Sequence, residues 1–266
     1  MIEDSLGLKI GIFDSGIGGL TVAKAIKNKL PQAELVYFGD TAHLPYGDKS
    51  PASIRHYSAK IAQFLLSENC TALVIACNTA SAHAFKTVKD VAGPDIPVFN
   101  VIDPVVEYIA TRYQNQKVGV IATKGTIKTR VYPRRIKIAD DSITVASKAT
   151  PLLAPMIEEG FFNNNISKTV IESYLKAREL KGIGSLVLGC THYPLIQSEV
   201  EAFFKGSVDI IDSANVVAES VAQGYSLKGK ETEDKFYVSD FTKAFEKSTQ
   251  TFFGKKIELK EERIFD

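Results

Sequence analysis

Two of the three cysteines stand where a cysteine could do chemistry. Cys77 follows the apolar run at residues 72–76, and Cys190 follows a similar run at residues 185–188. Both runs are typical of buried strands, and hydrogen-bonding residues that could open a helix come directly after each cysteine. One cysteine at the end of a buried strand is often an inert core residue, whereas two at matching positions indicate reactive thiols. A helix N-terminus favours the thiolate, because its partial positive charge lowers the pKa of the thiol. Cys70 ends a predicted helix and is expected to be structural.

Two thiols that face one substrate could serve three purposes. A disulfide is disfavoured, because the chain has no Cys-x-x-Cys motif. A zinc site made by Cys77, Cys190 and His192 lacks paired ligand spacing, and the chain has only 4 histidines. In the third use, one thiolate removes a proton from a carbon and the other thiol delivers a proton to the opposite face, which inverts the centre. This acid–base use explains why there are two thiols. His192, with a pKa near neutrality, could shuttle a proton or keep Cys190 charged.

A glycine-rich turn at residues 14–19 lies between a predicted strand and a predicted helix. Its spacing is not that of a dinucleotide loop, and no Walker lysine follows it. Its backbone amides and the Ser15 hydroxyl could bind a small anion, while Asp14 could bind an ammonium group or support a thiol. Further hydrogen-bonding side chains are expected at strand ends, namely Asn78, Thr79, Thr123, Thr126 and Thr191. A small substrate with two polar ends fits this lining better than a nucleotide.

Short apolar runs alternate with helical patterns along the whole chain, and these elements must position the candidate residues. Strands are expected at residues 8–13, 34–38, 72–76, 97–101, 117–122, 142–147, 185–188 and 208–211. Helices are expected at residues 19–30 and from Pro51 to about residue 69, with Ser50 as the N-cap of the second. Strands that alternate with helices predict an α/β fold with mainly parallel sheets.

The chain contains its own pattern twice. Residues 71–79 resemble residues 184–192, and residues 10–16 resemble residues 118–125 at nearly the same separation. This repeat predicts two pseudo-symmetric α/β half-domains. We place the first at residues 1–97 together with residues 211–266, which pack back onto it, and the second at 98–210. Ligands bind at the carboxyl ends of parallel strands, so we expect an active-site cleft between the halves with one thiol on each wall.

The composition excludes several classes of partner. The 266 residues include 32 Lys and Arg against 31 Asp and Glu, a net charge of +1. No global field therefore recruits nucleic acid or an anionic membrane. No uncharged apolar stretch reaches the roughly 18 to 20 residues of a membrane span, and the first ten residues lack the apolar core of a signal peptide. With only 3 cysteines, a disulfide scaffold is excluded, and we expect a cytoplasmic protein.

The motifs taken together carry a resemblance to a known family. They are residues 11–19 (GIFDSGIGG), 37–40 (YFGD), 45–47 (PYG), 76–80 (ACNTA) and 188–195 (LGCTHYPL). Their types and order resemble the glutamate racemases, which are cofactor-independent members of the aspartate/glutamate racemase superfamily. The resemblance spans most of the chain, and the set of motifs is far more specific than any one of them.

This resemblance implies an isomerase that interconverts L- and D-glutamate and supplies D-glutamate for peptidoglycan, with no cofactor and no metal. It implies that Cys77 deprotonates D-glutamate and that Cys190 deprotonates L-glutamate, with Asp14 and His192 as auxiliary acid–base residues and Glu158 as a further acidic position. The substrate-binding positions it implies are Asp14, Ser15, Pro45, Tyr46, Gly47, Asn78, Thr79, Thr191 and His192. Homodimers are common in the family, and nothing in the sequence marks an interface.

Three other functions fit parts of the sequence. An aspartate racemase is the nearest, but aspartate racemases tend to carry an acidic residue where this chain has His192. A non-catalytic amino-acid-binding protein would need neither Cys77 nor Cys190. A thiol hydrolase that uses one Cys–His pair would leave the second cysteine unexplained, and its activity would survive the change Cys77→Ala.

Overall fold

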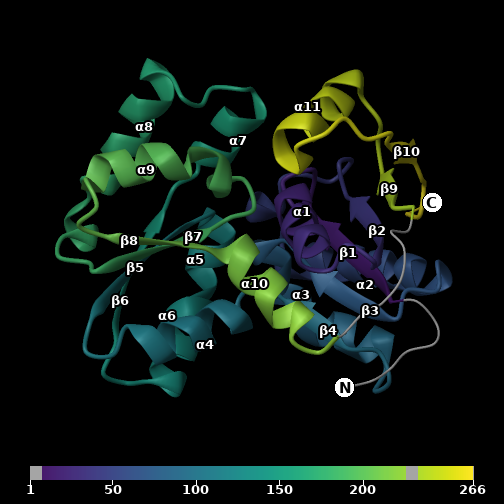
Figure 1. The fold of residues 1–266 in the computed structure, drawn as a ribbon, viewed down its shortest axis with the longest axis horizontal. Coiled ribbons are helices and arrows are strands. Elements are labelled where there is room, and N and C mark those ends of the chain that lie inside the picture. The colour runs from purple at the N-terminus through teal and green to yellow at the C-terminus, as the bar shows by residue number, and fades with distance from the viewer. Residues whose placement is uncertain (1–7, 226–232, 266) are drawn as a thin grey trace. The chain divides into compact units, whose positions relative to one another are not determined.

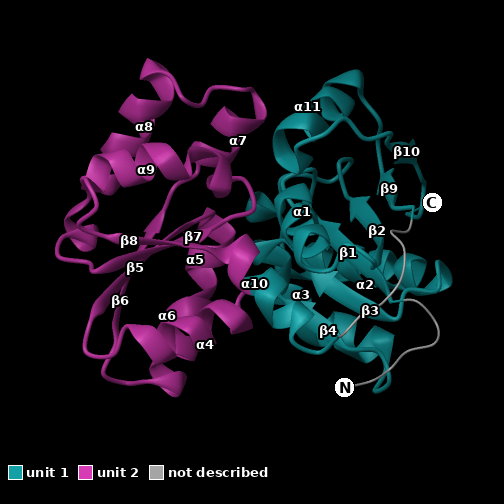
Figure 2. Cartoon of the chain, in the orientation of Figure 1, with its two compact units in different colours: residues 1–101, 217–266 teal, residues 102–216 magenta. Residues whose placement is uncertain are grey.

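A computed structural model describes residues 8–225 and 233–265 of the chain. The chain divides into two compact units, residues 1–101 with 217–266 and residues 102–216 (Figure 2). The chain passes from one unit to the other after residue 101 and returns after residue 216. The boundaries predicted from the sequence lie a few residues earlier, after residues 97 and 210. Strand β4 (Val98–Asn100) pairs with β3 (Ala72–Ile75) and so belongs to the first unit. The second crossing falls inside helix α10 (Ser213–Ala222), which leaves no break in the sequence pattern.

The first unit is built on a parallel sheet of six strands in the order β10-β9-β2-β1-β3-β4 (Figure 1). The strands not yet given are β1 (Lys9–Asp14), β2 (Glu34–Gly39), β9 (Lys235–Val238) and β10 (Lys260–Glu261). Strand β1 is central, because Gly11 faces Val36 on one side and Leu73 on the other. Nearly every residue of β1, β2 and β3 is buried, as in a sheet covered on both faces.

Among the described residues, five helical segments belong wholly to the first unit. They are α1 (Leu20–Lys29), η1 (Tyr46–Asp48), α2 (Pro51–Ser67), α3 (Asn78–Ala92) and α11 (Lys243–Phe253). Helix α2 begins as predicted, because the backbone N–H of Ser53 donates to Ser50 Oγ at 3.1 Å and Pro51 takes the first helical position. The connections through α1 and α2 cross the sheet in opposite directions, so right-handed crossovers place these helices on opposite faces. Helix α2 packs on α3, and α1 packs on α11.

The second unit holds a parallel sheet of four strands in the order β6-β5-β7-β8 (Figure 1). Its strands are β5 (Lys117–Ala122), β6 (Thr144–Ala149), β7 (Ser185–Gly189) and β8 (Asp209–Asp212). Its helical segments are α4 (Asp103–Arg112), α5 (Lys124–Thr129), α6 (Val131–Ala139), α7 (Leu153–Glu158), α8 (Asn165–Leu175), η2 (Arg178–Leu180), η3 (Tyr193–Ile196) and α9 (Gln197–Phe204).

The predicted α/β class with parallel sheets is confirmed. The order β2-β1-β3-β4 of the first sheet matches the order β6-β5-β7-β8 of the second, as the internal repeat requires. Strands β9 and β10 were not predicted, and they extend only the first sheet. Within residues 8–225 and 233–265, no helix combines the length and the apolar character that crossing a bilayer demands.

Candidate functional site

Cys77 forms the turn between a buried strand and a long helix. Strand β3 ends at Ile75, and Cys77 is the N-cap of α3 in an extended conformation. The backbone N–H of Ala80 donates to Cys77 Sγ at 3.4 Å, and the thiol donates to Ser15 Oγ at 3.6 Å. Because only 6% of Cys77 is exposed, the partial positive charge of the helix N-terminus acts on the sulfur with little screening by water. The helix N-terminus therefore points at the sulfur, and the reactivity of this thiol stays a prediction.

Asp14 organises the glycine-rich turn that follows β1. Its buried carboxylate accepts from the backbone N–H of Gly16 at 3.1 Å and from that of Gly19 at 3.0 Å. Two of the amides expected to bind an external anion are therefore used inside the turn. The Tyr37 hydroxyl donates to Gly16 O at 2.7 Å. A side chain at Gly39 would collide with the same carbonyl oxygen, so this close approach requires glycine.

Tyr37 lies close to both reactive groups of the first unit. Burial raises the pKa of Tyr37 well above its ordinary value, and the negative charges of Asp14 and Cys77 raise it further. The phenol therefore stays protonated and keeps donating to Gly16. Asn78 and Thr79, the first residues of α3, are also almost fully buried beside Cys77.

Tyr46 opens the short segment η1 and is held by a buried carboxylate. Its hydroxyl donates to Asp40 Oδ2 at 2.6 Å, and only 1% of its surface is exposed. Burial raises the pKa of Tyr46 above its ordinary value, and the charges of Asp40, Cys77 and Asp14 add to this. The residue is thus within electrostatic reach of Cys77. Its neighbours in the predicted binding motif differ in exposure, since Pro45 is exposed and Gly47 is partly buried.

Cys190 follows β7 in the second unit and has a different partner. Its sulfur lies 3.6 Å from His192 Nδ1, and His192 Nε2 lies 2.8 Å from Glu158 Oε1. Cys190 and His192 are buried, while 30% of the Glu158 side chain is exposed. Burial alone would lower the pKa of His192, but the hydrogen bonds and charges of Cys190 and Glu158 outweigh it and raise that pKa well above its ordinary value. The three side chains form a continuous line of contacts from the Cys190 sulfur through the imidazole of His192 to the Glu158 carboxylate.

Two of the three predicted threonines of the second unit, Thr123 and Thr191, lie just after strands, whereas Thr126 lies inside α5. Thr123 follows β5 and caps α5, because the backbone N–H of Thr126 donates to Thr123 Oγ1 at 3.2 Å. Thr191 is buried, and its Oγ1 lies 3.4 Å from His192 Nδ1. The hydroxyls of Thr123 and Thr126 thus serve a helix cap, and their part in binding stays a prediction.

Each unit therefore gathers its own group of predicted site residues at the carboxyl edge of its sheet. In the first unit these are Asp14, Ser15, Tyr46, Cys77, Asn78 and Thr79. In the second they are Thr123, Thr126, Glu158, Cys190, Thr191 and His192. Asp40 directly follows β2, and its backbone N–H donates to Asp14 O at 3.0 Å, but it was not among the predicted site residues. None of the three cysteines forms a disulfide, and the described residues contain no group of three or more His, Cys, Asp and Glu suited to hold a metal ion.

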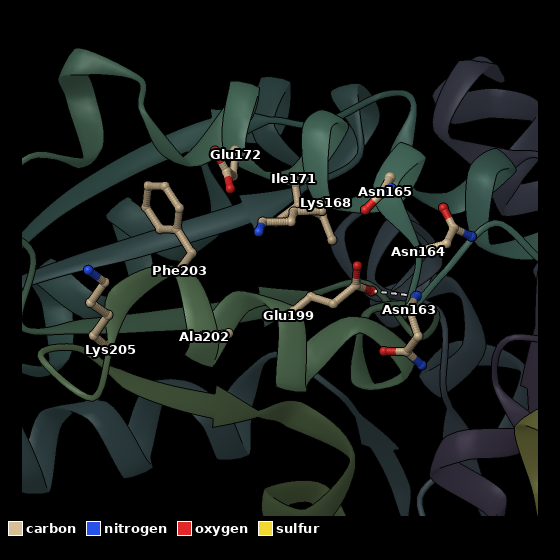
Figure 3. Close-up of a pocket in the computed structure, with 10 residues that line it drawn as sticks. All are labelled: Asn163, Asn164, Asn165, Lys168, Ile171, Glu172, Glu199, Ala202, Phe203 and Lys205. Atoms are coloured by element: carbon tan, nitrogen blue, oxygen red, sulfur yellow. Dashed lines mark hydrogen bonds between the residues drawn. The ribbon is translucent and has the colours of Figure 1, made fainter.

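A surface pocket of about 650 Å³ lies between α8 and α9 and contains none of the predicted site residues (Figure 3). Glu199 points across it and accepts from the backbone N–H of Asn163 at 2.9 Å and from Ser167 Oγ at 2.5 Å. These contacts fix the start of α8, and Asn164 caps the same helix. The polar groups of this pocket are thus explained by local structure.

Comparisons with known proteins agree with the motifs. The profile of the Asp/Glu/hydantoin racemase family matches residues 20–221. The chain is 41% identical over 254 residues to the glutamate racemase of Aquifex aeolicus, covering 95% of this chain and 97% of that one. It is 40% identical over 254 residues to the glutamate racemase of Geobacter metallireducens, covering 93% of both chains. The glutamate racemase of Francisella tularensis, solved in complex with D-glutamate, matches with a TM-score of 0.90 and 35% identity over 97% of this chain and 98% of that one.

Proposed function

This chain belongs to the Asp/Glu/hydantoin racemase family, and we propose that it acts there as a glutamate racemase, an isomerase that interconverts L-glutamate and D-glutamate. One observation carries the proposal. Two thiols stand at equivalent strand ends of two similar units, each beside groups that stabilise its thiolate. A protein that only bound glutamate would need neither thiol.

The reaction proceeds by two proton transfers on opposite faces of the α-carbon. With L-glutamate, the Cys190 thiolate removes the α-proton and becomes a thiol. The Cys77 thiol then gives its proton to the other face and becomes a thiolate, so that D-glutamate results. With D-glutamate the two cysteines exchange roles. This scheme requires both thiols to reach the α-carbon of one substrate molecule.

Neighbouring groups set the protonation state of each thiol. On the Cys77 side, the N-terminus of α3 stabilises the thiolate, the Ser15 hydroxyl accepts from the thiol, and Asp14 holds the adjoining turn in place. On the Cys190 side, the His192 imidazolium stabilises the thiolate and Glu158 stabilises the imidazolium. An α-proton of an amino acid is far less acidic than a thiol. The site must therefore exclude water and stabilise the charge that develops, using donors fixed in advance.

Four further features belong to the proposal. Asn78, Thr79 and Thr191 offer donors for the carboxylates of glutamate, and all three are buried next to a reactive cysteine.

The product D-glutamate would supply peptidoglycan synthesis, as the family implies. We place the reaction in the cytoplasm, which agrees with three free cysteines. A homodimer stays a prediction.

Loss of optical activity tests the function directly. Purified protein is incubated separately with L-glutamate, D-glutamate and L-aspartate, and the rotation is followed to completion. We expect both glutamate enantiomers to reach the racemic mixture, and aspartate to react far more slowly. Faster racemisation of aspartate would make the protein an aspartate racemase. Binding without any loss of rotation would make it a binding protein. Hydrolytic activity that survives Cys77→Ala would support a thiol hydrolase.

A further inference from the structure

We propose that the returning segment, defined as residues 235–265, positions the substrate loop at Tyr46 and Gly47 through two of its residues, Ser239 and Phe265. The proposal rests on the proposed function, because it takes the Tyr46-Gly47 loop as part of the glutamate site. Neither Ser239 nor Phe265 would touch substrate. Both act through Asp40 and its neighbours.

Strand pairing brings the returning segment to the substrate loop. Strand β9 runs parallel to β2, with Val238 facing Gly39, and the backbone N–H of Ser239 donates to Gly39 O at 3.0 Å. Ser239 therefore arrives beside Asp40, the first residue after β2. Its hydroxyl donates to Asp40 Oδ1 at 2.8 Å and accepts from the backbone N–H of Ala42 at 2.9 Å.

A second pair of bonds fastens the same turn one residue further on. Thr41 Oγ1 donates to Asp240 O at 2.6 Å and accepts from the backbone N–H of Asp240 at 2.9 Å. The chain that leads from β2 to Tyr46 is thus tied to the returning segment at three consecutive residues. Loops are ordinarily the most mobile parts of a fold, so these bonds remove freedom that the loop would otherwise have.

Asp40 links the returning segment to Tyr46, because its carboxylate is hydrogen-bonded to both. Its carboxylate is fully buried and accepts from Ser239 Oγ, from the Tyr46 hydroxyl at 2.6 Å and from His43 Nδ1 at 2.7 Å. A buried carboxylate is tolerated only where donors satisfy it. Removing the Ser239 hydroxyl therefore leaves Asp40 Oδ1 with His43 alone and removes the bond that joins Asp40 to the returning segment.

Phe265 packs against aromatic side chains next to Asp40. Its ring meets His43 edge-on with centroids 4.6 Å apart, and it meets Tyr57 edge-on at 5.6 Å. His43 stacks on Tyr57 at 4.1 Å, and Tyr57 lies 5.9 Å from Tyr46. Phe265 thus completes an aromatic cluster around His43, one of the side chains that contact Asp40.

The position of Tyr46 matters because η1 packs against α3, the helix that Cys77 caps. A shift of η1 changes where substrate lies relative to the sulfur. Displacements of about 1 Å in a substrate-positioning group can lower a rate by as much as about 100-fold. We therefore expect the effects of Ser239 and Phe265 to be visible in catalysis and not only in stability.

The test compares Ser239→Ala and Phe265→Ala with a control from the same segment. Phe253→Ala removes a ring that packs on Phe236 at 5.2 Å and has no contact with Asp40. We expect kcat/KM for both enantiomers to fall about tenfold in the first two variants, mainly through kcat, and to stay near the wild-type value in Phe253→Ala. All assays are run below the melting temperature of the least stable variant. Equal losses of kcat/KM in all three variants would overturn the proposal.

Two further measurements separate positioning from general destabilisation. Ser239→Thr keeps the hydroxyl and should restore most of the kcat/KM lost in Ser239→Ala. In a double-mutant cycle with Tyr46→Phe, the combined loss should be smaller than the product of the single losses, because both changes act through Asp40. A fully multiplicative loss would show that Ser239 does not act through this carboxylate.

Hydrogen exchange keeps the proposal testable even if the protein does not racemise glutamate. The backbone N–H of Asp48 donates to Pro45 O at 3.4 Å, and that of Lys49 donates to Tyr46 O at 3.1 Å. Exchange of these two amides should be faster in Ser239→Ala and Phe265→Ala than in Phe253→Ala. An unchanged exchange rate would overturn the positioning role, whereas absent racemisation in the wild type would overturn the proposed function alone.

Discussion

The two cysteines that we propose as catalytic have different neighbours. Cys77 relies on a helix N-terminus and a hydroxyl, which carry no titrating charge. Cys190 relies on His192, which can lose its charge, and on Glu158 behind it. The two halves of the reaction are therefore expected to respond differently to pH, although the halves of the fold repeat one another.

Replacing either reactive cysteine should abolish racemisation without unfolding the protein. For Cys77→Ala and Cys190→Ala we expect kcat to fall by at least about 1,000-fold, in the range found for loss of a general acid or base. Cys70→Ala is the matched control. Burial raises the pKa of Cys70 to about 12, so its thiol is inert and its removal should lower the melting temperature but keep kcat/KM. Substantial turnover in either of the first two variants would refute the two-thiol scheme.

Glu158 should stabilise the folded protein only where His192 is protonated. The pKa of His192 in the folded state is raised above its ordinary value of about 6.5. The stabilisation is therefore complete below about pH 6.5 and is lost as the pH rises through the folded-state pKa. Glu158→Gln should lower the free energy of unfolding clearly at pH 6 and less at higher pH, as measured by urea titration. The neighbouring exposed Glu159→Gln should show no such trend. If the difference in the free energy of unfolding between the wild type and Glu158→Gln increased with pH, the proposed pairing of Glu158 with protonated His192 would be wrong.

At the scale of elements, the strand-to-helix turns do most of the positioning. Cys77 and Thr123 follow parallel strands within two residues, and Asp14 is the last residue of β1. Such sites can be predicted because buried strands are apolar throughout and end sharply in polar residues. Asp40 and Ser239 were missed for a different reason. Their bond joins residues that are far apart in the chain and depends on β9, a strand of four residues with no distinctive pattern.

The N-cap of α2 offers a prediction confined to one element. Ser50→Ala should lower the free energy of unfolding by about 1 kcal/mol, since the Ser53 backbone N–H loses its side-chain acceptor. Racemase kcat/KM should not change, because Ser50 is exposed and serves the helix alone. The control is Ser53→Ala, which leaves the cap in place and should have a smaller effect. Equal destabilisation by both changes would show that the cap contributes nothing measurable.

At the scale of the whole molecule, the internal repeat was the most informative signal. It predicted two α/β halves, and both sheets show the same order over four strands. It could not reveal that the first sheet gains two further strands, because they lie outside the repeat. The repeat also could not give the exact boundaries between the units, since α10 continues without a break from the second unit into the first.

Racemisation should need nothing but the protein chain. Activity per mole of enzyme is expected to stay constant after exhaustive dialysis against EDTA, and after treatment with hydroxylamine to trap any carbonyl cofactor. The physical reason is that the proposed scheme uses only side chains of the protein for both proton transfers. Loss of activity that zinc or pyridoxal phosphate restores would contradict this expectation.

The position of deuterium in the product tests the central claim most directly. L-glutamate is incubated with enzyme in deuterated water, the reaction is stopped while most substrate remains, and the two enantiomers are separated for mass spectrometry. A thiol that removes a proton keeps it, while the other thiol donates from solvent. We therefore predict deuterium at the α-carbon of D-glutamate and protium in the remaining L-glutamate, with the mirror result from D-glutamate. Equal deuterium in both enantiomers from the start would mean that a single base serves both faces, and the two-thiol account would be wrong.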